Sequence, residues 1–94
     1  MPKTFVNHGR LPVVILFLAR NQPVEALDFR LLPGQSQAKD FTRPKGCAPV
    51  TKLDFNWLLS RTECQTVTVD LLEDASGNDH QTYHLYDEFI VVTT

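Results

Sequence analysis

The sequence predicts a mainly β protein, a small antiparallel β-sandwich or barrel of five or six strands. Apolar and polar residues alternate with a period of two in four segments, which is typical of half-buried strands. Clusters of Pro, Asn, Asp and Gly separate these segments, as expected for hairpin connections. A chain of 94 residues buries only a limited core, so residues 1–94 are expected to form a single domain.

The first strand pair is predicted in the N-terminal third. The run 12–19 is apolar at nearly every position, and 24–31 alternates, with Leu27, Phe29 and Leu31 on one face. The turn composition of 20–23 between them predicts a hairpin. Because 12–19 is apolar on both faces, we expect both faces to be covered, by another sheet, a helix or a partner chain.

Two interpretations apply to residues 51–60. As a strand, the segment places Leu53, Phe55 and Trp57 on one face. As a short helix, it begins at Thr51 as the N-cap residue. The alternation favours the strand, and the short helix at 51–60 remains the alternative.

The C-terminal half predicts two further strands, at 65–71 and 81–92, joined by a turn at 74–79. Asp87-Glu88 interrupts the second alternation and indicates a bulge. Residues 3–8 are expected to add a short edge strand. The residues predicted to face inward are Val67, Val69, Leu71, Tyr83 and Leu85.

Charge and hydropathy exclude several classes of function. The net charge of −2 argues against proteins that bind nucleic acid or anionic membranes through a basic surface. The longest apolar run, 11–19, is too short for a membrane-spanning helix, which needs about 20 residues. Its resemblance to a signal peptide fails at the cleavage site, where Phe17 occupies a position that requires a small residue. We therefore expect a cytoplasmic protein.

Catalytic, metal and cofactor motifs are not found. Cys47 and Cys64 form no C-x-x-C pair and are expected to be free thiols. His80 and His84 lie on a predicted strand, about 13 Å apart at ~3.3 Å per residue, which is too far for one metal ion. We therefore predict no specific metal, no cofactor and no catalytic residue.

A long connection, 33–49, is the main candidate for binding. It contains three prolines and two glycines, and connections of this length in small domains are often functional. It combines basic residues with one aromatic residue, a composition found at interface hot spots. The candidate binding residues are Lys39, Phe41, Arg43 and Lys45.

Two functional hypotheses follow. The first is a non-catalytic binding or adaptor module that contacts a protein partner through the loop 33–49 or an exposed strand edge. The alternative is a β-barrel or sandwich that binds a small ligand, or a small enzyme that uses His84, Tyr86 or Cys47. A solid core with an exposed apolar edge favours the first hypothesis, and a closed cavity with convergent polar groups favours the second.

Self-association is also expected. The segment 89–92 is apolar on both faces, and no Lys or Pro in it blocks edge pairing. We predict a homodimer through Phe89, Ile90, Val91 and Val92.

Overall fold

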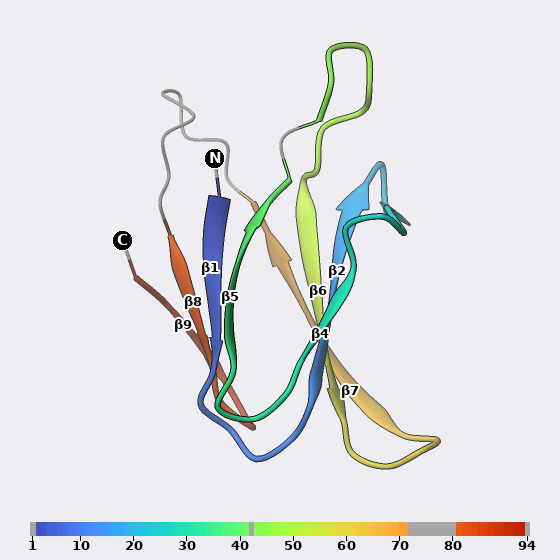
Figure 1. The fold of residues 1–94 in the computed structure, drawn as a ribbon. Coiled ribbons are helices and arrows are strands. Elements are labelled where there is room, and N and C mark those ends of the chain that lie inside the picture. Colours follow the sequence, from blue (N-terminus) through green and yellow to red (C-terminus); the bar gives the residue numbers. More distant parts are fainter. Residues whose placement is uncertain (1, 42, 72–80, 94) are drawn as a thin grey trace.

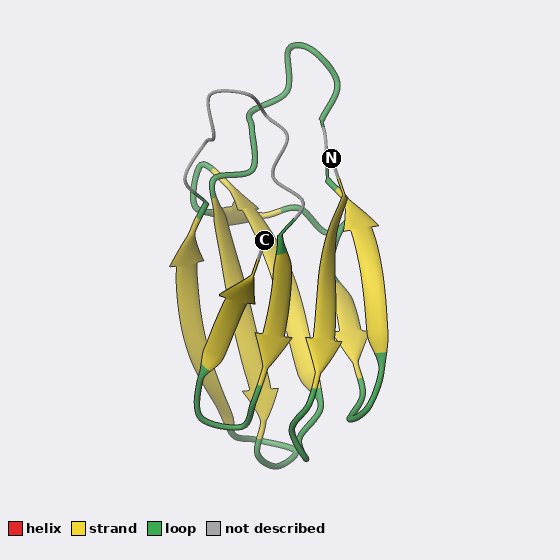
Figure 2. Ribbon diagram, turned by 90° about the vertical axis from the view of Figure 1, so that its left-hand side faces the viewer, coloured by secondary structure: helices red, strands yellow, loops and turns green. Residues whose placement is uncertain are grey.

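The computed structural model describes residues 2–41, 43–71 and 81–93. It confirms a mainly β protein: two sheets pack face to face as a sandwich and not as a closed barrel. The described residues contain no helix, and therefore none long and apolar enough to cross a membrane (Figure 2). The described strands number nine, against the five or six predicted.

The first sheet has the strand order β5-β1-β8-β9 (Figure 1). Strands β1 and β8 run parallel, and the other neighbours are antiparallel. The bounds are β1 Pro2–Asn7, β5 Ser36–Asp40, β8 Thr82–Leu85 and β9 Ile90–Thr93.

The second sheet has the order β3-β2-β6-β7, with β4 also paired to β2, and all its pairs are antiparallel. The bounds are β2 Val13–Ala19, β3 Gln22–Pro23, β4 Phe29–Leu31, β6 Lys52–Leu58 and β7 Cys64–Asp70.

Aromatic rings fill the space between the sheets. Phe5 of β1 is fully buried, and its ring centroid lies 5.2 to 6.1 Å from those of four others. These partners come from both sheets, so this one residue ties the two layers together. They are Phe17, Phe29, Phe55 and Tyr83.

Segment 51–60 is a strand, as the alternation favours, and the alternative of a short helix is wrong. Strand β6 buries Leu53, Phe55 and Trp57 and leaves the residues between them half-buried. A strand between two others satisfies its backbone on both sides, and β6 pairs with β2 and β7.

Two predicted segments differ from the structure in the first half of the chain. Only Phe29–Leu31 of the predicted strand 24–31 pairs, because turns occupy 25–27. The predicted loop 33–49 contains strand β5, so the remaining connection before β6 runs from 41 to 51. The sequence of β5, Ser-Gln-Ala-Lys-Asp, is a polar edge strand without the apolar alternation that marks a half-buried strand.

The first sheet also corrects two predictions. Asp87-Glu88 is not a bulge within one strand but part of the reversal between β8 and β9, where the Tyr86 N–H donates to the Phe89 carbonyl at 2.9 Å. Strand β1 is not at an edge but lies between β5 and β8. The predicted turn 74–79 lies outside the described residues.

Strand β2 is covered fully on only one face. Val13, Ile15 and Phe17 are buried between the sheets, whereas Val14 and Leu16 on the opposite face are half-buried. No second layer covers that face among the described residues. Polar neighbours on β6 flank it instead, since Asn56 is paired with Val14 and Asp54 with Leu16.

Candidate functional site

The hairpin β8–β9 carries three of the five large apolar side chains that are exposed among the described residues. Phe89 is 55% exposed, Val91 41% and Val92 43%, whereas Ile90 is half-buried against the core. We call Phe89, Ile90, Val91 and Val92 the β9 edge. It combines apolar side chains with a strand that has a neighbour on one side only.

The backbone of the β9 edge has hydrogen-bonding groups on its unpaired side. The Tyr86–Phe89 hydrogen bond and the pairing of Leu85 with Ile90 fix the alternation along the hairpin. In an antiparallel pair, bonded and non-bonded residues alternate. Val91 therefore bonds to β8, and the backbone groups of Ile90 and Val92 point away from the sheet.

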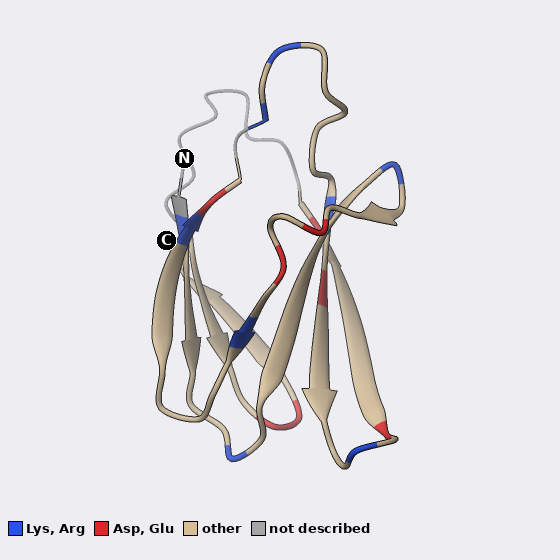
Figure 3. Ribbon diagram, turned by 45° about the vertical axis from the view of Figure 1, so that its right-hand side comes forward, with Lys and Arg blue, Asp and Glu red and all other residues tan. Residues whose placement is uncertain are grey.

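Charge distinguishes β9 from the other edge strands that the structure describes. Strand β9 has no charged residue and no proline, and Figure 3 shows β8 and β9 entirely in tan. Every other edge carries at least one residue of the kinds that block edge pairing. These residues are Lys39 and Asp40 on β5, Asp70 on β7, Arg30 on β4 and Pro23 on β3.

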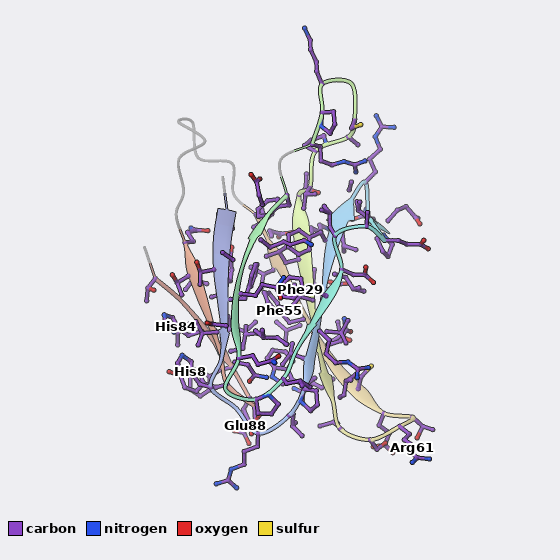
Figure 4. The ribbon with its side chains drawn as sticks, in the orientation of Figure 1. His8, Phe29, Phe55, Arg61, His84 and Glu88 are labelled. Carbon is purple, nitrogen blue, oxygen red and sulfur yellow. The ribbon has the colours of Figure 1, made fainter. Side chains whose placement is uncertain are left out.

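A histidine pair lies beside this edge, on the outer face of the first sheet (Figure 4). His8 Nε2 and His84 Nδ1 are 2.8 Å apart, the ring centroids are 5.1 Å apart, and the planes differ by 17°. Each nitrogen lies about 1.1 Å from its ring centre. Both nitrogens must therefore lie close to the line between the centroids, so the two rings meet edge to edge at the distance of an N–H···N hydrogen bond.

The pair continues toward β9 on one side and toward the hairpin turn on the other. His84 Nε2 lies 3.1 Å from Thr93 Oγ1, which links β8 to the end of β9. His8 stacks with Tyr86, and Tyr86 stacks with Phe89, at centroid distances of 5.0 and 4.6 Å. The exposed Phe89 ring is thus held in place by a neighbouring ring.

Buried Asn7 fixes the chain just before His8. Its Nδ2 donates to the carbonyls of Leu11 and Leu31 at 2.9 and 3.0 Å, and its Oδ1 accepts from the Gly9 N–H at 2.9 Å. At 1% exposure, this amide is buried away from solvent, where hydrogen bonds are electrostatically stronger. It therefore sets the path of residues 8–11 and the position of His8.

Asp87 fixes the same connection from the hairpin turn. Its Oδ1 accepts from the N–H groups of Arg10 and Leu11 at 2.8 and 3.2 Å. A Cβ atom at Gly9 would lie 2.1 Å from this oxygen, so the contact requires glycine. The interruption Asp87-Glu88 in the sequence therefore marks an anchor between the two connections.

The four residues predicted to bind a partner do not all project into solvent. The Lys39 ammonium lies 5.9 Å from the Phe29 ring centre, and Phe41 packs edge-on against Phe17 at 5.0 Å. Arg43 is half-buried and Lys45 is exposed. Lys39 and Phe41 therefore contribute to the fold itself.

The residues of the catalytic alternative are only partly brought together. His84 and Tyr86 both contact His8. Cys47 lies in the connection 41–51, which follows the Asp40 end of β5, and Asp40 pairs with Pro2 at the far end of β1 from His8. Cys47 and Cys64 are free and exposed.

Metal-ligating groups are sparse in the described residues. No three of His, Cys, Asp and Glu there lie close enough to hold one ion. His80, whose spacing from His84 was considered above, lies outside the described residues. The contact of His84 with His8, 76 positions apart, has no signal in the spacing of histidines along the chain.

Comparison with known proteins gives no assignment. No protein-family model, curated protein or solved structure matches this chain. The function is therefore inferred from the β9 edge and its neighbours.

Proposed function

We propose that this protein is a non-catalytic binding module that acts through protein–protein contact, with the β9 edge as the contact element. The observation that carries the proposal is the uncharged strand β9, which is paired on one side only and leaves Val91 and Val92 more than 40% exposed. Such an edge accepts an extended segment of another chain as an additional strand. The aromatic packing around Phe5 supports this module over a cavity that holds a small ligand.

Recognition by strand addition uses two kinds of contact. The outward backbone groups of Ile90 and Val92 supply hydrogen bonds that do not depend on the partner's sequence. The exposed side chains of Phe89 and Val91 supply apolar contacts that do. Phe89 is suited to this because its stacking on Tyr86 lowers the conformational entropy lost on binding.

The loop is the weaker of the two contact elements named from the sequence. Lys39 and Phe41 already have ring contacts within the sandwich, and substitution there would disturb folding as well as binding. Arg43 and Lys45 remain as its accessible charges, and exposed ionic contacts contribute little each.

Site-specific photocrosslinking in cells of the source organism tests the choice of surface. A benzophenone amino acid replaces Val92 in one variant and Lys45, in the loop, in the other. We expect adducts with protein chains from Val92 and few from Lys45. Adducts from Lys45 alone would indicate that the loop, and not the β9 edge, binds the partner. The absence of adducts from both positions would refute the proposal.

A further inference from the structure

We infer that the chain that pairs with the β9 edge is a second copy of this protein, joined through two antiparallel β9 strands about a two-fold axis. The inference rests on the proposed function, since it uses the same edge. A partner recognised through charged residues would need residues of opposite charge on β9, and β9 has no charged residue. A second β9 strand is itself apolar and uncharged, and it therefore fits this edge.

The register follows from the backbone. Two antiparallel strands pair residues that face the same side of the sheet, and only Ile90 and Val92 have outward backbone groups. When Ile90 of each copy pairs with Val92 of the other, the outward backbone N–H and C=O groups of all four residues form hydrogen bonds. The axis then passes between the two Val91 residues, which face each other as a non-bonded pair.

This register places apolar residues opposite apolar residues on both faces. On the inner face, Ile90 meets Val92 of the second copy and extends the rows begun by Leu85 and Tyr83. On the outer face the two Val91 side chains meet, each flanked by His84 of its own chain. Close non-bonded pairs bring such side chains into contact across the axis.

Neighbouring registers match less well. A shift by two residues in one direction brings Glu88 of one copy opposite Val92 of the other. A shift in the other direction brings Val91 opposite Thr93. The first shift places a charged side chain against Val92, and the second leaves Val92 opposite itself as the one apolar pair, so the side chains favour the register centred on Val91.

The pairing closes after two copies. It uses the β9 edge of each chain, and the opposite edge of the sheet, β5, carries Lys39 and Asp40. A two-fold contact of this kind is self-complementary and leaves no free copy of the same edge. Because β9 has only four residues, the interface is smaller than a standard one, and we expect a micromolar dissociation constant.

Charge reversal at the axis tests both the partner and the register. Val91→Lys and Val91→Glu each place like charges opposite one another, so each variant alone is expected to be monomeric. An equimolar mixture is expected to form a one-to-one heterodimer. Thr93→Lys puts the same charge on the same strand, opposite Phe89 of the second copy, and is the matched control that remains dimeric.

Sedimentation equilibrium at tens of micromolar protein is the measurement, with circular dichroism of each variant to confirm folding. The wild-type chain should sediment near twice its 10.7 kDa mass. Should a charged variant unfold, Val92→Pro is the second variant, because it removes an outward N–H and leaves the bonds to β8 intact. It should raise the dissociation constant at least about tenfold, the equivalent of one or two hydrogen bonds.

Three outcomes overturn the inference: a monomeric wild-type protein, Val91 variants that remain dimeric, or a mixture of Lys and Glu variants that fails to associate. If the protein is monomeric but crosslinks to other proteins from Val92, the partner is not a second copy, and the proposed function is still supported. A monomer without crosslinks removes both.

Discussion

Replacement of Asn7 by Asp perturbs the buried amide that holds the connection between β1 and β2. The substitution keeps the shape of the side chain but exchanges an NH2 group for an oxygen. That oxygen would face the carbonyls of Leu11 and Leu31, at the 2.9 and 3.0 Å now spanned by hydrogen bonds. The bond from the Gly9 N–H to the other oxygen remains available.

The expected loss of stability follows from the two carbonyls. Each buried carbonyl left without its donor costs about 1–3 kcal/mol. We therefore expect Asn7→Asp to lower the free energy of unfolding by about 4 kcal/mol at neutral pH, a large part of the stability of a small domain. A repelled negative charge at this site raises the cost further.

The loss should depend on pH. Burial and the two facing carbonyls favour the neutral carboxyl, so its pKa in the folded variant is raised above the unfolded value of about 3.9. A carboxyl with a raised folded pKa is least costly below the unfolded pKa, and its cost grows as pH rises through the folded pKa. Since the protonated group can donate to one carbonyl, the deficit relative to wild type should fall by roughly half near pH 3.

Urea unfolding monitored by the fluorescence of Trp57, the single tryptophan, measures both effects. Asn56→Asp is the matched control, because Asn56 is half-buried and its amide N–H reaches the Val14 carbonyl only at 3.4 Å. We expect this control to change stability by less than about 1 kcal/mol. An equal loss in the two variants, or a deficit at Asn7 that does not change with pH, would refute the assigned role of the Asn7 amide.

Three further sets of substitutions test the turns and the core. Gly9→Ala and Asp87→Ala should each lower the free energy of unfolding by about 1–2 kcal/mol, because both changes lose the Asp87 bonds to Arg10 and Leu11. The double variant should therefore be scarcely less stable than either single variant. Additive losses in thermal unfolding would contradict this. Asn21→Gly should stabilise by up to about 1 kcal/mol, since Asn21 has a φ of 62° in a two-residue hairpin turn, and Asn21→Ala, measured the same way, should not. Trp57→Phe should cost less than about 1.5 kcal/mol by circular dichroism, because the Trp57 Nε1–H is buried with no partner among the described residues, whereas Phe55→Ala should cost about 3–5 kcal/mol.

Alternation of apolar and polar residues predicted the strand where it coincides with pairing, as in β6 and β8, but not over most of 24–31, of which only Phe29–Leu31 pairs. In β6 and β8 every second residue is buried, and Trp57 or Tyr83 could be assigned to the core from its phase alone. Strand β5 has no such phase: only Lys39 of its five residues is half-buried, and the rest are exposed. Its place in the fold is set by pairing with β1, which sequence spacing does not encode.

The candidate site was predicted only in part for the same reason. The β9 edge was visible as an apolar, uncharged segment, and the structure confirms that β9 lies at a sheet edge. The histidine pair was not visible, because it depends on the parallel pairing of β1 with β8, which joins the two ends of the chain. In the sequence Asp87 only interrupts the alternation, and its bonds to Arg10 and Leu11 form where the two connections meet in the fold.

Packing within a single copy of the chain does not explain why residue 91 is a valine. The Val91 side chain lies on the outer face of the sheet, opposite His84, and is absent from the residues that pack against the core. A lysine there would keep the hydrogen bonds of β9 to β8 and would protect the edge at little cost, as Lys39 and Asp40 protect β5. Strand propensity alone does not require valine, since its advantage depends on neighbours that pack against it. In the dimer that we infer, a second β9 strand would supply those neighbours and would account for the exposed valine.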